Sequence, residues 1–127
     1  MGEFSDSITA WCREVRRDMD RIPQQYAEKG GHYIVDVTPF ITGKLRGGYY
    51  IRINSDDVRP SQPVDPTGIF TKALMTAEAK KIRWGDRVEI VNDVEYGFYV
   101  DQGTIHFDGR NMVGKTLIYL ENLDLGL

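Results

Sequence analysis

Cysteine is almost absent from this sequence: Cys12 is the one example among 127 residues, so no intramolecular disulfide can form. Long apolar runs are missing as well, and the longest extend over a few residues, far short of a membrane span. Residues 1–6 lack both the basic start and the apolar stretch of a signal peptide. We therefore expect a protein that is made and folds in a cytoplasm and has no membrane partner.

An excess of basic residues is also missing. The chain has 16 Lys and Arg against 19 Asp and Glu, a formal net charge of -3, whereas a dedicated nucleic-acid binder normally carries a strongly basic face. We therefore expect no sequence-specific binding of nucleic acid. Hydrophobic residues make up 41% of the chain, which is enough for the core of one domain, and we assign residues 1–127 to a single domain.

Residues suited to catalysis or metal binding are few. His32 and His106 are the only histidines, and neither has a partner at a metal-binding interval. His106 and Asp108 are close enough in sequence to form a dyad of a small enzyme, but solvated loop residues are the commoner reading. Cys12 has no histidine beside it and is interpreted as a small hydrophobe at the edge of the core. The sequence thus predicts no catalytic residue, no cofactor and no metal site.

A long amphipathic helix is predicted at the N-terminus, because apolar residues recur there at spacings of three and four. This stripe consists of Phe4, Ile8, Trp11, Val15, Met19, Ile22 and Tyr26. Ser5 or Asp6 is expected to cap the start of the helix, and Gly30-Gly31 to end it. Pro23 lies inside the pattern and removes one backbone donor, so a kink or a break is expected there.

Three short strands are predicted. Tyr33–Val37 and Arg87–Asn92 have the length and composition of strands, and Tyr49–Asn54 alternates between two faces. In Tyr49–Asn54 we expect Tyr49, Ile51 and Ile53 to face the core, and Tyr50, Arg52 and Asn54 to face the other way.

Further helices are predicted downstream. A helix is expected from Ile69 to Ile82, with Phe70, Ala73, Leu74 and Ala77 facing inward. Helical spacing is also found in Tyr96–Val100, which Gly103 closes. Met112–Leu123 fits a helix or a continued strand, and we favour the helix. The fold class is α+β, with the long N-terminal helix and a second helix packed on one face of a small antiparallel β-sheet.

Residues 55–68 are predicted to form a mobile, proline-rich loop. The segment has three prolines and little apolar content, and it is long for a connection. It ends in Asp65-Pro66, which suit the cap and the first turn of the next helix. Arg59 is its candidate assembly contact, because an arginine can bind a partner's carboxylate through two parallel hydrogen bonds.

Residues 37–48, Val-Thr-Pro-Phe-Ile-Thr-Gly-Lys-Leu-Arg-Gly-Gly, followed by Tyr49, carry a resemblance to a known family. They resemble the signature T-P-V-D-T-G-x-L/A-R-x-x-W of small neck and tail-completion proteins of tailed bacteriophages, which are also described as minor tail proteins. Residues 85–104 are similar to that family's G-D-x-V-x-I-x-N-x-V-x-Y-A-x-Y-L-E-x-G-T segment, and residues 110–117 to its P-x-G-M-V-R-x-T ending. The three segments occur in the family's order.

The resemblance implies a structural component of the virion, in the neck, at the head–tail connector or at tail completion, that forms part of a ring around the DNA exit channel. Its implied partners are copies of itself and the neighbouring neck, connector and tail proteins, and its implied location is the virion, after assembly in the host cytoplasm. The alternative within this class is a tail-terminator or tail-tube-associated protein. The family-motif residues, to which the resemblance assigns structural and assembly roles, are Thr38, Pro39, Thr42, Gly43, Leu45, Arg46, Asn92, Tyr96, Tyr99, Asp101, Gly103, Met112 and Val113.

Ile41 stands where the family has an acidic residue and Asp101 where it has Glu, and the proline of the last motif is absent, so contacts of those side chains are not carried over.

The motif residues also have conformational preferences that predict local structure. Gly43 suits a turn with positive φ, which would send Leu45 into the core and Arg46 outward. Asn92 favours an Asx turn at the end of a strand. Beyond that turn, Tyr96 and Tyr99 are expected to cover the core, while Asp101 faces solvent.

Overall fold

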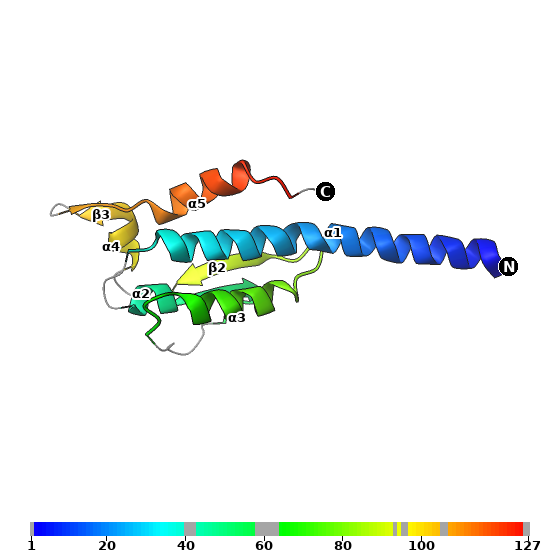
Figure 1. Ribbon diagram of the computed structural model, residues 1–127, viewed down its shortest axis with the longest axis horizontal. Helices are drawn as coiled ribbons and strands as arrows, with labels where there is room; N and C mark the ends of the chain where they lie inside the picture. The colour runs from blue at the N-terminus through cyan, green and yellow to red at the C-terminus, as the bar shows by residue number, and fades with distance from the viewer. Residues whose placement is uncertain are drawn as a thin grey trace.

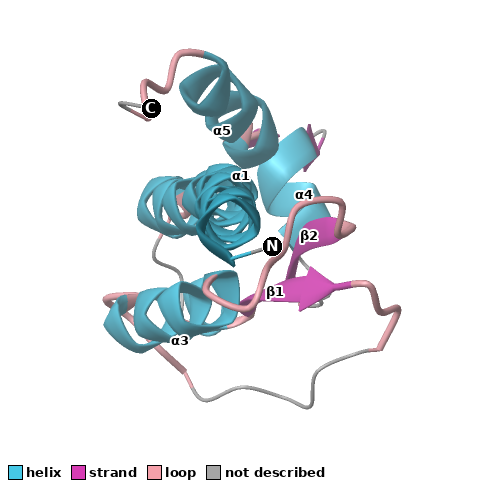
Figure 2. Ribbon diagram, turned by 90° about the vertical axis from the view of Figure 1, so that its right-hand side faces the viewer, coloured by secondary structure: helices cyan, strands magenta, loops and turns pink. Residues whose placement is uncertain are grey.

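The computed structural model is an α+β fold built around one long central helix, as the sequence predicts (Figure 1). It describes residues 2–39, 43–57, 64–92, 94, 97–104 and 107–125. The elements are α1 (Gly2–Val37), α2 (Lys44–Gly47), β1 (Tyr49–Ile53), α3 (Ile69–Ala79), β2 (Val88–Asn92), α4 (Gly97–Gln102), β3 (Gly103–Thr104), β4 (Phe107–Asp108) and α5 (Met112–Glu121). Seen along α1, α3 and α5 lie on different sides of it, and β1 and β2 lie beside it (Figure 2).

Helix α1 continues well past the point where the sequence predicts its end. The predicted terminator Gly30-Gly31 and the predicted strand Tyr33–Val37 are both wrong, because all of these residues are helical. The two glycines serve close packing instead. A Cβ at Gly30 would lie 3.1 Å from Cδ1 of Leu120 on α5, and one at Gly31 would lie 2.6 Å from Cε of Met75 on α3. Their missing side chains therefore let both neighbouring helices approach α1, and this packing outweighs the low helix propensity of glycine.

Pro23 lies inside α1, and the helix continues on both sides of it without the break considered above (Figure 1). Proline removes one backbone donor from the helix interior. Contacts on either side hold the helix in place: Ala27 is buried in the core, and a carboxylate oxygen of Asp20 accepts a hydrogen bond of 2.8 Å from the backbone N–H of Trp84.

The start of α1 also differs from the prediction. Ser5 and Asp6 do not cap the helix, because it already begins at Gly2. The Ser5 carbonyl instead accepts a hydrogen bond of 3.0 Å from the Thr9 hydroxyl one turn further on. The apolar stripe begins only at Phe4, so its periodicity placed the start of the helix too late.

Strands β1 and β2 form an antiparallel ribbon, with Tyr49 opposite Asn92 and Tyr50 opposite Val91. Both strands lie where the sequence predicts them. Tyr49 and Ile51 face the core as expected. The expected exposure of Tyr50 is wrong, because its side chain is also buried. It lies directly across from Val91, and such cross-strand pairs shield each other on one face of a ribbon.

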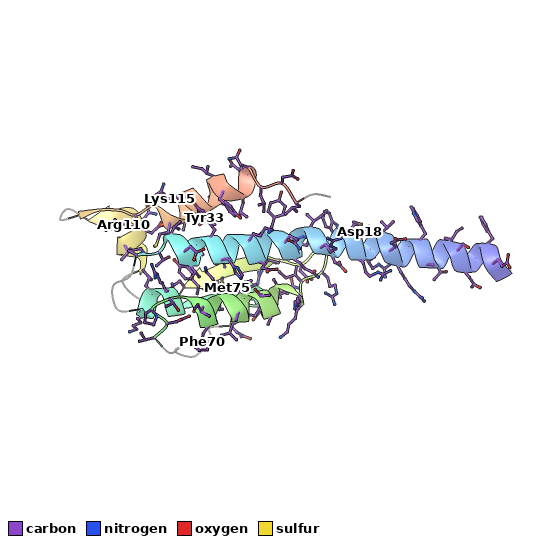
Figure 3. The ribbon with its side chains drawn as sticks, viewed as in Figure 1. Asp18, Tyr33, Phe70, Met75, Arg110 and Lys115 are labelled. Carbon is purple, nitrogen blue, oxygen red and sulfur yellow. The ribbon has the colours of Figure 1, made fainter. Side chains whose placement is uncertain are left out.

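Helix α3 is present, but its predicted inward face is wrong. Phe70, Ala73, Leu74 and Ala77 were expected to face the core, and all four are exposed. The buried side chains are instead Thr71, Met75 and Ala79. In Figure 3, Phe70 points away from α1 while Met75 lies between the two helices.

Polar contacts between α1 and α3 select this orientation. Lys72 forms an ion pair with Asp36, and Nε2 of His32 lies 2.9 Å from the Thr76 hydroxyl. Together with the close approach of Met75 to α1, these contacts fix which side of α3 is buried. The apolar pattern alone could not identify it, because both faces of this helix carry apolar side chains.

The segment before α3 is held by a buried carboxylate. Oδ2 of Asp65 accepts hydrogen bonds of 2.8 Å from both the backbone N–H and the hydroxyl of Thr71. The predicted cap is only partly right: Gly68, not Asp65, is the N-cap residue, although Asp65 does accept a hydrogen bond from an N–H of the first turn. Because α3 begins at Ile69, Pro66 is not its first residue. Residues 58–63, which include Arg59, lie outside the described residues, and the mobility predicted for the loop stays a prediction.

The C-terminal region is helical. Helix α4 is shifted by one or two residues from the predicted Tyr96–Val100, and Gly103 follows it with a φ of 88°. The favoured reading of residues 112–123 as a helix is confirmed by α5. Helix α5 packs on α1, where the rings of Tyr33 and Tyr119 stack with their centroids 4.4 Å apart.

Candidate functional site

The described residues of the first motif segment, residues 37–39 and 43–48, lie between the end of α1 and the start of β1. Gly43 has a φ of 79°, which confirms the predicted left-handed turn, and Leu45 is buried in the core as expected. The prediction that Arg46 faces outward is wrong. Its Nε donates a hydrogen bond of 2.8 Å to the Thr38 carbonyl, and its Nη1 donates one of 2.7 Å to the Pro66 carbonyl. Arg46 therefore ties the end of α1 to the segment before α3.

Thr38 lies at the centre of a buried polar contact. Its side chain is fully buried, and its hydroxyl donates a hydrogen bond of 2.6 Å to the Ile34 carbonyl. The Tyr49 hydroxyl lies 2.8 Å from the Thr38 hydroxyl and 3.8 Å from the sulfur of Met112. Burial raises the pKa of Tyr49 above its ordinary value. Ile34 of α1, Tyr49 of β1 and Met112 of α5 thus meet around Thr38 through uncharged groups.

Asn92 and Asp101 hold the second motif segment. Oδ1 of Asn92 accepts a hydrogen bond of 3.0 Å from the backbone N–H of Val94, the predicted Asx turn, and its Nδ2 donates one of 2.7 Å to the Leu45 carbonyl. The prediction that Asp101 faces solvent is wrong, because its side chain is buried. Oδ1 of Asp101 accepts a hydrogen bond of 3.0 Å from the N–H of Val113, one of the donors that the first turn of α5 leaves unpaired.

The described motif residues therefore lie together at one end of the molecule and hold its segments to each other. Val113 is the exposed member, and its side chain faces the surface beside α5. Thr42 and Tyr96 lie outside the described residues, and for Tyr99 the structure describes only the backbone of α4. Apart from Val113, these residues form a scaffold, so a surface for binding a partner must be formed mainly by other residues.

The N-terminal part of α1 forms the first such surface. Residues 2–19, here called the N-terminal arm, extend beyond the other elements (Figure 1). The predicted apolar stripe runs along the arm, where Val15 is half-buried but the other stripe residues are exposed, with 78% of Phe4 and 63% of Trp11 accessible to solvent. Cys12 on the same arm is exposed, not at the edge of the core as expected.

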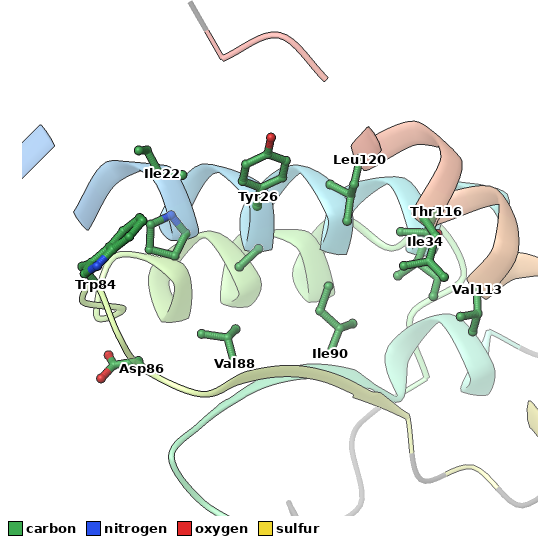
Figure 4. Close-up of a pocket in the computed structure, with 13 residues that line it drawn as sticks. Ile22, Tyr26, Ile34, Trp84, Asp86, Val88, Ile90, Val113, Thr116 and Leu120 are labelled. Carbon is green, nitrogen blue, oxygen red and sulfur yellow. The ribbon is translucent and has the colours of Figure 1, made fainter. Parts of the chain in front are cut away.

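An apolar groove of about 550 Å³ forms the second surface, between the C-terminal half of α1, β2 and α5 (Figure 4). Its walls are mostly aliphatic and aromatic, and Asp86 is the one charged side chain among the described residues that line it. The lining residues are Ile22, Pro23, Tyr26, Ala27, Ile34, Trp84, Asp86, Val88, Ile90, Val113, Thr116, Leu117 and Leu120. Stripe residues Ile22 and Tyr26 belong to this lining, so the apolar face of α1 continues from the arm into the groove.

Asp86 is held rigidly at the edge of the groove. Its carboxylate accepts hydrogen bonds of 2.7 Å from the backbone N–H of Arg83 and 2.9 Å from the side-chain amide of Asn54. These two hydrogen bonds, the first above all, lower the pKa of Asp86 below its ordinary value. The groove therefore presents a fixed negative charge at neutral pH.

The outer face of α3 is the third surface. Its side chains Ile69 and Phe70 are 66% and 77% exposed, and Leu74 is 47% exposed. Ala73 and Ala77 lie on the same face of the helix and are also exposed. Contiguous exposed apolar side chains of this kind mark interaction surfaces more often than scattered ones.

The structure brings no catalytic constellation together among the residues it describes. His32 is engaged with α3, where its Nε2 contacts the Lys72 carbonyl and the Thr76 hydroxyl. His106 lies outside the described residues, and the side chain of Asp108 is not described. In the described part of the chain no three acidic, histidine or cysteine side chains are grouped to hold a metal, and no helix there has the length and apolarity to cross a membrane.

Comparison with known proteins adds no relative, since the chain matches no family model, no curated protein and no solved structure. Sequence reasoning found the motif residues but missed the two exposed faces that flank α1, the groove and the outer face of α3. The apolar pattern of α3 contained the signal, but it was interpreted as core. The capping role of Asp101 was also missed, because this residue lies well before α5 in the sequence and no local pattern pairs it with the N–H of Val113.

Proposed function

We propose that this protein is a structural component of a tailed bacteriophage particle, a neck, head–tail joining or tail-completion protein that forms part of a ring around the DNA exit channel. Three family-like segments support the proposal, at residues 37–48, 85–104 and 110–117. The observation that carries it is their convergence: Thr38, Tyr49 and Met112 meet in one buried contact, and Asn92 holds Leu45. Segments far apart in the sequence thus act as one structural unit.

The exposed apolar surfaces fit an assembly protein. The arm, the groove and the outer face of α3 each place several large apolar side chains in solvent, and such grouped side chains mark interaction surfaces. Such surfaces suit the proposed partners, which are copies of this chain and neighbouring neck, connector and tail proteins. The arm extends beyond the rest of the fold and is the surface best placed to reach a different protein.

The charge of the chain suits a channel wall. A net charge of -3 gives no general attraction for a DNA backbone, so DNA could pass a ring of copies without being held. The proposed protein therefore binds no nucleic acid sequence specifically and no membrane. It is assembled in the host cytoplasm and resides in the virion.

Disruption of the gene in a phage that encodes this chain tests the proposal. Electron microscopy of the lysate is expected to show filled heads and finished tails that remain separate, and a plasmid copy of the gene should restore joined particles. Tails of abnormal length would instead indicate a tail terminator, the related alternative. Normal numbers of infectious, joined particles without the protein would contradict the proposal.

A further inference from the structure

Two different apolar surfaces lie on opposite sides of α1. The outer face of α3 is convex, because it is the outer ridge of a helix, and the space beside β2 and α5 is a groove. Figure 2 shows α3 and α5 separated by α1, so one chain cannot bring its own α3 ridge into its own groove. A chain with a ridge on one side and a groove on the other can bind further copies of itself head to tail.

The ridge has the spacing of a helix that binds in a groove. Phe70, Ala73, Leu74 and Ala77 stand at positions i, i+3, i+4 and i+7, the pattern by which amphipathic helices insert into apolar grooves. The two alanines keep the ridge narrow beside the large side chains Phe70 and Leu74. On the groove side, Val113 and Leu117 of α5 are half exposed and offer apolar surface to an entering helix.

The charges around the two surfaces are complementary. The ridge of α3 ends at Lys80 and Lys81, both exposed. The groove contains Asp86, and exposed Glu121 directly follows the lining residue Leu120. Opposite charges at the rims of the two apolar surfaces favour this pairing, whereas a parallel ridge-to-ridge contact would place lysines of two copies side by side.

We propose that α3 of one copy binds in the groove between α1, β2 and α5 of a second copy, and that this heterologous contact repeats from copy to copy. The surfaces are defined by the structure alone, whereas the closure of the repeat into a ring rests on the proposed function. The occupant of the groove is thus the chain itself, through Phe70 and Leu74.

The size of the contact makes each pairing weak. Helix α3 has 11 residues, so it is about 16 Å long, and one face of it covers a few hundred Å². A stable complex buries about 800 Å² per partner. Free copies should therefore associate only at high concentration, while copies that are held by a neighbouring ring would add contacts until the circle closes.

Sedimentation velocity of the purified protein, from about 10 µM to about 1 mM, tests the pairing. The wild type should form dimers and larger species as concentration rises. Leu74→Asp on the ridge and Leu117→Asp in the groove should each weaken association by about tenfold or more. Ile118→Asp is the matched control: it is as exposed as Leu117 on the same helix but does not line the groove, so it should associate like the wild type.

A mixture of the two defective variants gives the decisive reading. Leu117→Asp keeps an intact ridge and Leu74→Asp an intact groove, so together they should form heterodimers that grow no further. Absence of wild-type association at 1 mM, unchanged association of either variant, or no heterodimer in the mixture would each overturn the proposal. If Leu117→Asp weakens association but Leu74→Asp does not, α3 does not occupy the groove, and the N-terminal arm is the better occupant. None of these results depends on phage assembly, so the proposed function is tested separately by gene disruption.

Discussion

Gly43 shows what a single position contributes to this fold. Its positive φ turns the chain between α1 and β1, and its carbonyl accepts hydrogen bonds from the N–H groups of Gly47 and Asp65. A Cβ there would lie 2.8 Å from Cγ1 of Val64 and 2.9 Å from the backbone nitrogen of Pro66. Both the backbone angle and the space around it therefore require glycine.

Substitution of Gly43 should destabilise the protein more than substitution of another glycine with the same kind of backbone. Gly85 has a φ of 94°, but a Cβ there would meet no atom within 4 Å. Gly85→Ala should cost about 1–2 kcal/mol from the left-handed φ alone. Gly43→Ala should cost clearly more, and Gly43→Val more again. Urea denaturation gives the free energies of unfolding, and equal losses at the two glycines would contradict the crowding seen at Gly43.

Asp86 makes the stability depend on acidic pH. Its pKa is lowered in the folded protein by the hydrogen bond from the Arg83 N–H and that from Asn54. A carboxylate with a lowered folded pKa stabilises the protein above its unfolded pKa of about 3.9, and this contribution is lost as the pH falls through the folded value. Stability should therefore fall as the pH drops below about 4.

Asp86→Asn should reduce this fall. The measurement is thermal unfolding of wild type and variant at pH 7 and at several values between about 5 and 2.5. The variant should be less stable than wild type at pH 7, and the difference should shrink toward low pH. If the difference in stability between wild type and Asp86→Asn is the same at every pH, the charge of Asp86 does not stabilise the folded protein, contrary to what its hydrogen bonds indicate.

Helix α1 consists of two parts with different roles. From Ala27 to Val35 it is the centre of the core, whereas the arm projects from the fold with most of its apolar stripe in solvent. The same 3.6-residue periodicity thus supports folding in one half of the helix and leaves an unused surface in the other.

Removal of residues 2–14 should leave the fold intact, because their side chains are largely exposed. The melting temperature should change by less than about 4 °C, which corresponds to roughly 1 kcal/mol in a domain of this size. Ile34→Ala, on the buried half of the same helix, is the matched comparison and should cost about 2–5 kcal/mol. If the shortened protein no longer unfolds cooperatively, the arm is needed for folding, and this division of α1 is contradicted.

In phage, the shortened protein should fail to restore joined particles.

At the scale of elements, the sequence allowed the fold class, the two strands of the ribbon and helices α3 and α5 to be predicted. Local patterns sufficed there, because strand alternation and helical spacing are short-range signals. The end of α1 was misplaced because Gly30 and Gly31 serve contacts with Leu120 and Met75, which lie far away in the sequence. The buried side of α3 was inverted for the same reason. Contacts between residues far apart in the sequence determine both the end of α1 and the buried face of α3, and a local sequence pattern does not reveal such contacts.

The motif residues were found from the sequence, but their roles were only partly predicted. The turn at Gly43 and the Asx turn at Asn92 follow from short-range chemistry and are confirmed. Arg46 and Asp101 were both expected to face solvent, yet each binds backbone groups of a distant segment. From sequence alone, a charged side chain is predicted to face solvent unless a partner for it is recognised nearby. The partners of Arg46 and Asp101 are far away in the sequence, so only the folded chain shows them.

In the molecule as a whole, a scaffold carries three apolar surfaces, of which the arm and the groove share the apolar face of α1. The scaffold is fixed by buried contacts of the motif residues, and the ridge, the groove and the arm lie on different sides of it. In the proposed function, a subunit that contacts like copies on two sides and another protein along its arm uses all three surfaces. The account therefore depends on the protein being part of a larger assembly.

Immunogold electron microscopy of intact particles, from a tailed phage that encodes this chain, tests whether the protein is a component of the virion. An antibody raised against the purified protein should label one place on each particle, at the junction of head and tail or at the end of the tail. Particles made without the gene product, if any are recovered, provide the unlabelled control. Label spread over the capsid or along the tail shaft, or none on purified virions, would contradict the account.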